Sequence, residues 1–181
     1  KSRDDKYLFP SRASKDTTEV WILPTATPDA VMQSVYGCQS QLQYHVDSRG
    51  EQLYCIVYGK TPHGRLLTLP VSALAEQAWQ EVLPESPTRI LEDIECFQDY
   101  CVLFEREEGI QKVSVLDPLS YLRTEVPFIE PLRSVSESAV YDFASPTFRI
   151  VYSSFVTPAQ VREYDARTLT YVVLKEQYVG A

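Results

Sequence analysis

Residues 147–179 read TFRIVYSSFVTPAQVREYDARTLTYVVLKEQYV, and the fold can be predicted by comparing the rest of the chain with this stretch. Phe148, Ile150 and Tyr152 occupy alternate positions, and a second alternating run follows at 161–164. Such alternation is typical of half-buried strands. Thr157-Pro158 marks a turn between the two runs, and a polar break at 165–168 precedes a third run at 171–174. The stretch therefore predicts three short antiparallel strands in succession.

The same pattern recurs upstream at a nearly constant interval. The alternating runs that stop just before a Pro or Asp end at Leu23, Leu69, Leu116 and Tyr164, in steps of 46, 47 and 48 residues. Aromatic-rich runs precede them at 7–9, 54–58, 100–104 and 148–152, and outer runs follow around Val35, Val82, Val126 and Val173. A further run comes first in three units, at 42–47, 90–97 and 139–144, and the first unit lacks it.

A period of about 40 to 50 residues with four strands per unit is the signature of a β-propeller blade. We therefore predict an all-β fold: a β-propeller fragment of about four blades of four antiparallel strands, with an incomplete first blade. The whole chain, 1–181, would be part of a single propeller domain with approximate blades 1–37, 38–86, 87–131 and 132–181. The alternative is a β-sandwich with chance spacing, since sandwiches also have short, regularly spaced strands. Residues 71–79 indicate one short helix or an irregular crossover.

Composition and charge limit the class of protein. Of the 181 residues, 44% are hydrophobic and 12% aromatic, which argues against disorder. The net charge is −8, from 25 acidic and 17 basic residues, and the basic residues are scattered, so we expect no nucleic-acid partner. No apolar run approaches the ~20 residues that cross a bilayer, so we expect no membrane partner. The absence of an initial Met and of a first strand suggests a fragment of a longer chain.

The four cysteines are Cys38, Cys55, Cys96 and Cys101, and two of them are predicted to belong to the core. Cys55 and Cys101 occupy equivalent places in two aromatic runs, where a free Cys behaves as a small apolar residue. Cys96 and Cys101 could face each other across a hairpin, although a cytosolic chain would keep them reduced. His45 and His63 have no zinc-ligand spacing, so we expect no metal and no cofactor.

The sequence carries no recognisable reactive centre, and we assign no catalytic residue. Its six glycines form no G-x-S-x-G nucleophile elbow, no phosphate loop and no dinucleotide fingerprint. The charged run from Glu105 to Gly109 is expected to be a solvated hairpin turn.

Three stretches resemble a known family. They are SRASKDTTEVWIL at 11–23, ILEDIECFQDYCVLFEREEGIQKVSVLD at 90–117, and SSFVTPAQVREYDARTLTYVVLKEQ at 153–177. These stretches resemble the propeller of the prolyl oligopeptidase family of serine peptidases, nearer to its oligopeptidase B branch, and the last resembles the closing part of that propeller. The shared motifs are blade signatures, not catalytic ones.

The resemblance implies a function. In that family a seven-bladed propeller covers the active site of a separate α/β-hydrolase domain and restricts access to short peptides. It implies hydrolysis of a peptide bond through a Ser, His and Asp set, located beyond Ala181, and a cytoplasmic location. The partners would be that catalytic domain and short peptide substrates.

The inner runs of the blades would line the channel of such a propeller. Four polar residues on these runs are candidates for channel-lining positions: His45, Asp47, Glu95 and Asp142. The alternative function is a stand-alone propeller that acts as a protein-interaction scaffold, because a fold does not fix a function. A parent that kept the fold and lost the chemistry is a third possibility.

Overall fold

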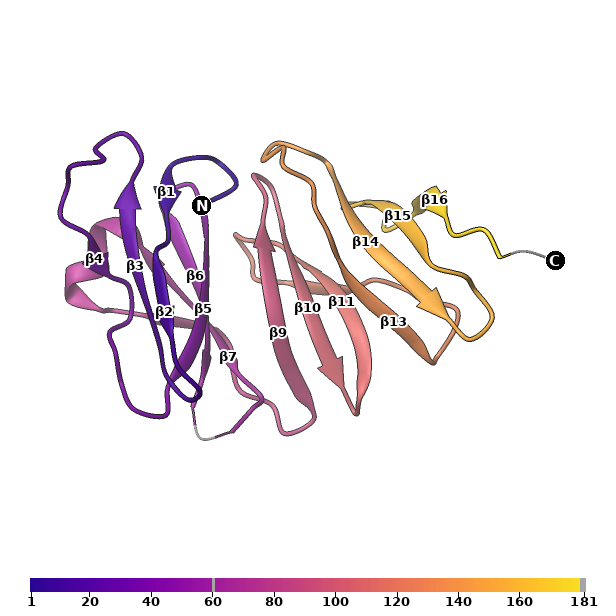
Figure 1. Cartoon of the computed structure of the whole chain (residues 1–181), viewed down its shortest axis with the longest axis horizontal. Helices are drawn as coiled ribbons and strands as arrows, with labels where there is room; N and C mark the ends of the chain where they lie inside the picture. Colours follow the sequence, from indigo (N-terminus) through magenta and orange to yellow (C-terminus); the bar gives the residue numbers. More distant parts are fainter. Residues whose placement is uncertain (60, 180–181) are drawn as a thin grey trace.

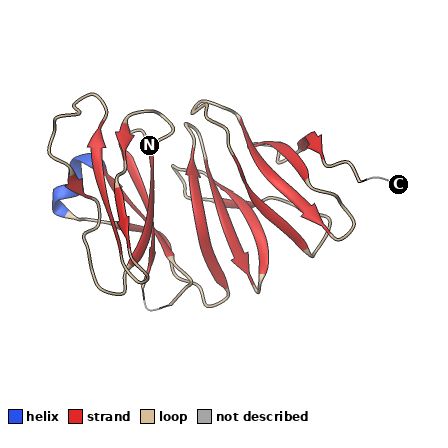
Figure 2. Ribbon diagram, in the orientation of Figure 1, coloured by secondary structure: helices blue, strands red, loops and turns tan. Residues whose placement is uncertain are grey.

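Strands make up nearly all of the regular secondary structure in the described residues. The structure, a computed structural model, describes residues 1–59 and 61–179. Its strands form four antiparallel sheets, which lie next to one another in chain order and fan out around a common axis (Figure 1). Figure 2 shows a short helix at one edge of this arrangement. The predicted all-β propeller fragment is therefore confirmed, and the two facing layers of a sandwich are not what the strands form.

The four sheets follow one another along the chain. The first sheet contains β1 (Tyr7–Leu8), β2 (Ser11–Ala13), β3 (Thr18–Pro24) and β4 (Gln33–Ser34). The second contains β5 (Gln43–Arg49), β6 (Gln52–Tyr58), β7 (Arg65–Pro70) and β8 (Gln80–Leu83). The third contains β9 (Arg89–Cys96), β10 (Cys101–Glu107), β11 (Ile110–Leu116) and β12 (Arg123–Glu125). The fourth contains β13 (Arg133–Ser138), β14 (Thr147–Ser154), β15 (Gln160–Asp165) and β16 (Tyr171–Glu176).

In the part of the chain that the structure describes, the first sheet lacks an innermost strand. Its β1 and β2 both pair with β3, in consecutive parts of one register, and Pro10 separates them. Proline has no N–H to donate to a ladder, but the Pro10 carbonyl accepts a 2.8 Å hydrogen bond from the N–H of Trp21. Together β1 and β2 therefore occupy one strand position, which makes this blade incomplete, as the sequence predicts.

The second and third sheets, which each have a neighbouring sheet on both sides, bury both of their faces. Along β6, Leu53, Cys55 and Val57 pack into a core shared with the first sheet. The residues between them, Tyr54 and Ile56, pack into a second core shared with the third sheet. Successive side chains of a strand point to opposite faces, so a strand buried on both faces has a continuous apolar sequence. This explains the uninterrupted run Leu53 to Val57.

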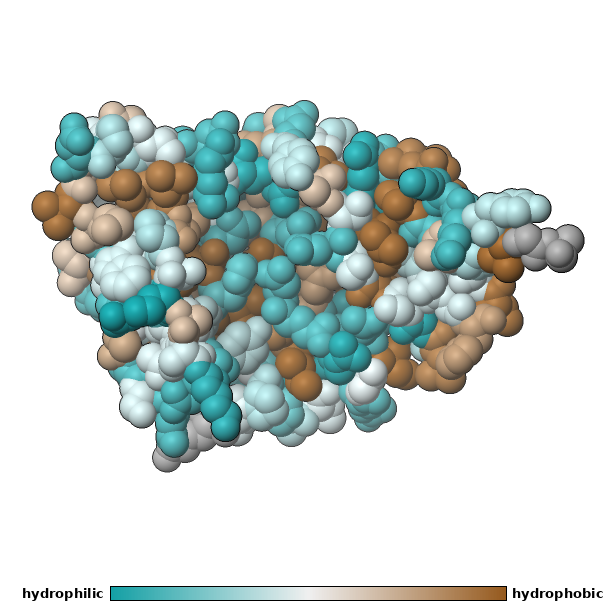
Figure 3. All heavy atoms as spheres, viewed as in Figure 1, coloured by the Kyte–Doolittle hydropathy of each residue, from teal (hydrophilic) through white to brown (hydrophobic). Residues whose placement is uncertain are grey.

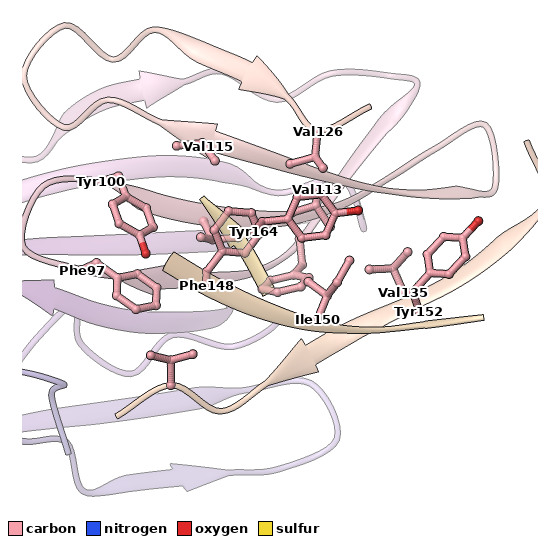
Figure 4. Close-up of a cluster of buried hydrophobic side chains, with 13 residues drawn as sticks. Phe97, Tyr100, Val113, Val115, Val126, Val135, Phe148, Ile150, Tyr152 and Tyr164 are labelled. Atoms are coloured by element: carbon pink, nitrogen blue, oxygen red, sulfur yellow. The ribbon is translucent and has the colours of Figure 1, made fainter. Parts of the chain in front are cut away.

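A third, aromatic core joins the last two sheets (Figure 4). The rings of Phe148 and Tyr164 stack with centroids 5.5 Å apart, and those of Phe97 and Tyr100 stack at 4.6 Å. Stacked aromatic pairs contribute about 0.5–1.5 kcal/mol beyond the burial of their area. The alternating run of β14 points Phe148, Ile150 and Tyr152 into this core, as predicted from the sequence.

The last strand of the fourth sheet, β16, is an edge strand that pairs only with β15 among the described strands. On β16, Tyr171, Val172, Val173 and Leu174 are between 40% and 58% exposed. Figure 3 shows hydrophobic residues gathered at this end of the molecule. The four sheets therefore form an open arc with an exposed apolar edge strand at its C-terminal end.

The inner strand of the fourth sheet differs from the prediction. The sequence pattern places it at 139–144, but β13 runs from Arg133 to Ser138, and the earlier assignment is wrong. Val135 is the only buried side chain of β13, and serines occupy three of its six positions. A strand with one buried apolar residue gives no alternating signal, whereas the residues that follow it resemble a strand in sequence.

The charged run after Phe104 also differs from the prediction. The ladder with β11 continues to Glu107, and the turn consists only of Glu108 and Gly109, which have φ values of 51° and 84°. Glu105 is 2% exposed, and its carboxylate accepts hydrogen bonds from Arg123 at 2.5 Å and Ser114 at 2.6 Å. The interpretation of Glu105 as part of a solvated loop is therefore wrong, because these two donors allow its burial.

The predicted short helix is present as a 3₁₀-helix, η1, from Val71 to Glu76. Its Leu74 packs into the core between the first and second sheets. Within the described parts of the chain, no helix combines the length and the apolar character that crossing a membrane would need.

Candidate functional site

Polar side chains gather where the inner strands of the second, third and fourth sheets come together. On β5, Tyr44, Val46 and Ser48 are buried, so the alternate residues His45 and Asp47 project away from the core. Two adjoining hollows, of about 520 and 690 Å³, lie beside these strands. Figure 3 shows hydrophilic residues over the middle of the molecule. The strand period thus creates a polar face on the same strands that build the core.

The first of these side chains, His45, pairs with Asp93 of β9. His45 Nε2 lies 2.9 Å from Asp93 Oδ1, and the two side chains are 49% and 33% exposed. Burial acts to lower the pKa of His45, but the hydrogen bond and negative charge of Asp93 outweigh it and raise the pKa above its usual value. This pair connects the second and third sheets at the rim of the hollow.

Asp47 connects the same two sheets one step further along β5. Its Oδ2 accepts a 2.8 Å hydrogen bond from the backbone N–H of Cys96, and its Oδ1 accepts one from the N–H of Ser48. Burial raises the pKa of Asp47, against the effect of these two N–H donors. Asp47 therefore has a structural partner in the neighbouring blade as well as a position beside the hollow.

Glu95 is the most deeply buried carboxylate of this group. It is 9% exposed, and its Oε1 lies 3.4 Å from a guanidinium nitrogen of Arg3, which stacks over the Phe97 ring at 4.1 Å. Burial raises the pKa of Glu95 to about 7, Arg3 opposes this shift, and the carboxylates of Glu137 and Asp93 add to it. Near neutral pH, Glu95 can therefore hold or release a proton.

The structure brings three of the four predicted residues together and leaves the fourth apart. His45, Asp47 and Glu95 border one hollow. Asp142 lies in the segment after β13, where its carboxylate accepts a hydrogen bond from the N–H of Ala144. Its neighbour Tyr141 is 87% exposed and borders the second hollow, while Asp142 borders neither.

The sequence pattern does not identify the other ionisable members of the group, among them Arg3, Asp93 and Glu137. Asp93 follows a register irregularity in the pairing of β9 with β10, so simple alternation does not place it. Glu137 lies on the serine-rich strand that the pattern misplaced. No sequence pattern identifies Arg3 as a member of the group. Arg3 reaches the second hollow because it lies in the segment before β1, at the place where the first blade has no inner strand.

The group as a whole is acidic. The hollows are lined by the carboxylates of Asp5, Asp47, Asp93, Glu95 and Glu137, with Lys1, Arg3 and His45 as the basic groups. A recessed surface with an excess of carboxylates attracts cationic groups. Among residues 1–59 and 61–179, no three His, Cys, Asp or Glu side chains are grouped so that they could hold a metal ion.

The fold and this polar face define a class: a β-propeller domain whose inner strands carry ionisable side chains. A family model described as the prolyl oligopeptidase N-terminal beta-propeller domain matches residues 1–177. The chain belongs to this family. The resemblance noted from the sequence is therefore confirmed.

Solved structures share the fold. Oligopeptidase B from Leishmania major superposes with a TM-score of 0.90 at 22% identity, over 99% of this chain and 27% of that chain. Oligopeptidase B from Trypanosoma brucei has a TM-score of 0.88, also at 22% identity over 99% of this chain and 27% of that one.

Curated relatives are also peptidases by name. Dipeptidyl aminopeptidase BI of Pseudoxanthomonas mexicana is 24% identical over 184 residues, covering 99% of this chain and 25% of the relative. A prolyl endopeptidase-like protein of Gallus gallus is 28% identical over 122 residues, covering 66% of this chain and 16% of the relative. The chain thus spans about a quarter or less of the length of these relatives.

Proposed function

We propose that this chain is a non-catalytic, substrate-gating part of a serine oligopeptidase whose catalytic centre lies in a separate α/β-hydrolase domain. The parent protein would hydrolyse peptide bonds in short peptides in the cytoplasm. The observation that carries the proposal is the polar group on the inner strands, where His45, Asp47 and Glu95 border a common hollow. Family membership supports the same assignment.

The way in which the blades are held together supports a gating role. The apolar cores between sheets fix the blades face to face, so the inner strands form a continuous wall. A peptide that passes along this wall meets charged and hydrogen-bonding groups instead of apolar surface. A flexible short peptide can follow such a path, whereas a folded protein is too wide to enter a narrow opening.

The partner in this proposal is the catalytic domain of the same parent protein. Fold alone does not establish this role, since propellers also serve as interaction scaffolds. The scaffold differs in one measurable property, because it needs no reactive serine anywhere in the protein. A serine-reactive probe therefore separates the two functions.

The experiment uses the full-length protein that contains this chain. We expect a fluorophosphonate probe to label one serine, and we expect a short fluorogenic peptide to be cleaved while the same cleavage sequence inside a folded protein is not. Glu95→Ala and Glu137→Ala should change kcat/KM for the short peptide by about threefold or more, with the labelling rate unchanged. Glu108→Ala, on the exposed β10–β11 turn, is the matched control and should leave kcat/KM unchanged.

Two results would overturn the proposal. The first is absence of labelling together with absence of peptide cleavage, which would leave the scaffold function. The second is equal cleavage of the free peptide and the sequence embedded in a folded protein, which would show a peptidase without gating.

A further inference from the structure

Two buried cysteines face each other at the tip of the β9–β10 hairpin. Cys96 and Cys101 are direct partners in the antiparallel register, and both are fully buried. Their sulfur atoms lie 3.4 Å apart, and the Cys101 thiol donates to Cys96 Sγ. Both side chains point into the core between the second and third sheets.

The backbone at this position suits a covalent link. The turn is closed by a 2.9 Å hydrogen bond from the N–H of Phe97 to the carbonyl of Tyr100. The next pair, Cys96 and Cys101, is not hydrogen-bonded across the ladder, since the Cys96 N–H donates to Asp47. Facing Cα atoms of such a pair are about 4.5 Å apart, which lies within the range of disulfide-linked residues, about 4.4–6.8 Å.

We propose that Cys96 and Cys101 form a reversible cross-strand disulfide, which makes the β9–β10 hairpin a site of oxidative modification. The other two cysteines differ from this pair in their surroundings. Cys38 is exposed, and Cys55 points into the core between the first and second sheets. Oxidation of the folded chain should therefore select one pair among the four cysteines.

The oxidant is a small peroxide, and the reaction balances with hydrogen peroxide. One thiolate attacks the O–O bond to give a sulfenic acid and hydroxide, and the second thiol displaces the sulfenic oxygen as water. Overall, two S–H bonds break, one S–S bond forms and the peroxide is reduced to two molecules of water. Burial raises the pKa of the Cys96 thiol, so little thiolate is present and the reaction should be slow.

The disulfide would fasten a junction between three blades. The backbone carbonyl of Gln98, in the hairpin turn, accepts a 2.6 Å hydrogen bond from Arg49 Nε of the second sheet. The Gln98 N–H donates to the carbonyl of Phe143, in the segment between β13 and β14, at 2.9 Å. Joining β9 to β10 beside this turn would resist opening of the hairpin and of both contacts.

The test uses the chain with Cys38→Ser, which removes the exposed thiol. The protein is equilibrated in reduced and oxidised glutathione, both folded and in urea, and free thiols are then alkylated under denaturing conditions. Trypsin releases both cysteines in one peptide, 90–106. In the folded sample we expect this peptide to become two hydrogen masses lighter and to escape alkylation, while Cys55 remains alkylated.

The comparison with urea shows whether the fold causes the pairing. We expect the folded chain to form the disulfide at a glutathione disulfide concentration about tenfold or more below that needed in urea. In a parallel sample the chain is refolded from urea in the same buffers. Both thiols are then accessible to glutathione before they become buried, so slow access to the folded core cannot prevent oxidation. If peptide 90–106 still carries two alkyl groups after oxidative refolding, or if the urea sample oxidises as readily, the proposal is overturned.

Two further measurements complete the design. Cys96→Ser and Cys101→Ser should each leave the remaining cysteine of this pair alkylated. Hydrogen exchange at the hairpin amides should slow by about tenfold or more on oxidation of the Cys38→Ser chain, and treatment with a dithiol reductant should reverse the change. Unchanged exchange would contradict a fastened junction.

Discussion

Asp47 of β5 accepts a 2.8 Å hydrogen bond from the backbone N–H of Cys96 on β9, and these residues are 49 positions apart. Arg49 and Gln98, separated by the same interval, form a second such bond at 2.6 Å. One structural repeat therefore separates the two partners in each contact. Polar groups on the inner strands therefore hold neighbouring blades in a fixed relative position, and some of them also border the hollow.

The first prediction concerns this contact. Asp47→Ala should leave the Cys96 N–H without an acceptor, at a cost of about 1–3 kcal/mol. We expect hydrogen exchange at the Cys96 amide to accelerate by at least tenfold, which corresponds to about 1.4 kcal/mol. Asp47→Asn retains one acceptor oxygen and should have the smaller effect. Equal exchange in the wild type and in Asp47→Ala would show that the bond contributes nothing.

The second prediction concerns pH and Glu95. Its pKa is raised to about 7 in the folded chain, so the folded state holds a proton that the unfolded state releases at lower pH. Stability should therefore be highest below about pH 4.5 for this group and fall as the pH rises toward 7. The loss is of the order of 3 kcal/mol.

Glu95→Gln tests this linkage because glutamine mimics the protonated carboxyl. Urea unfolding should be measured at several pH values from about 5 to about 8. The free energy of unfolding of Glu95→Gln should depend less on pH than that of the wild type, and the variant should be the more stable of the two at the upper end. Glu108→Gln on the exposed turn should keep the wild-type slope. A wild-type slope in Glu95→Gln would refute the assignment.

The third prediction compares two glycines with positive φ. A Cβ at Gly64, where φ is +71°, would lie 2.9 Å from Tyr58 Cε1, whereas a Cβ at Gly50, where φ is +57°, has nothing within 4 Å. Gly50→Ala should therefore cost only the backbone strain, about 1–2 kcal/mol. Gly64→Ala should cost about 1–3 kcal/mol more, because it also displaces a packed ring.

The readout for the glycine pair is the thermal midpoint. Gly64→Ala should lower it clearly more than Gly50→Ala. Displacement of Tyr58 should also weaken its 2.5 Å hydrogen bond to the carbonyl of Leu91, in the next sheet. Equal midpoints for the two variants would contradict the close approach at Gly64.

The fourth prediction concerns the exposed end of the arc. The apolar strand β16 should make the isolated chain associate, since an unpaired, apolar edge strand promotes pairing between molecules. Sedimentation velocity should show a mass that rises with concentration, and Leu174→Glu should reduce this rise. A sharp, concentration-independent thermal transition from a monomer of the unmodified chain would contradict the prediction.

The repeat could be predicted from the sequence because it depends on local pattern. Phe148, Ile150 and Tyr152 alternate because β14 packs one face on the preceding sheet, and the run from Leu53 to Val57 is continuous because β6 packs on both faces. Such patterns need only the period of a strand. The serine-rich β13 escaped prediction because it buries a single apolar side chain.

The candidate site was predictable only in part. His45 and Asp47 follow from alternation along β5, but Asp93 and Glu137 required the register across sheets. The buried position of Glu105 likewise depends on Arg123, 18 residues away. Partners distant in the chain leave no local pattern.

The number of strands in each unit and the faces that they bury can be read from the sequence. A strand that buries one face has an apolar residue at every second position, and a strand that buries both has a continuous apolar run. The tertiary structure alone decided which charged side chains meet on the inner strands and which cysteines face each other. The physical reason is that these meetings depend on how one blade packs against the next, and that packing sets distances between residues about one repeat apart.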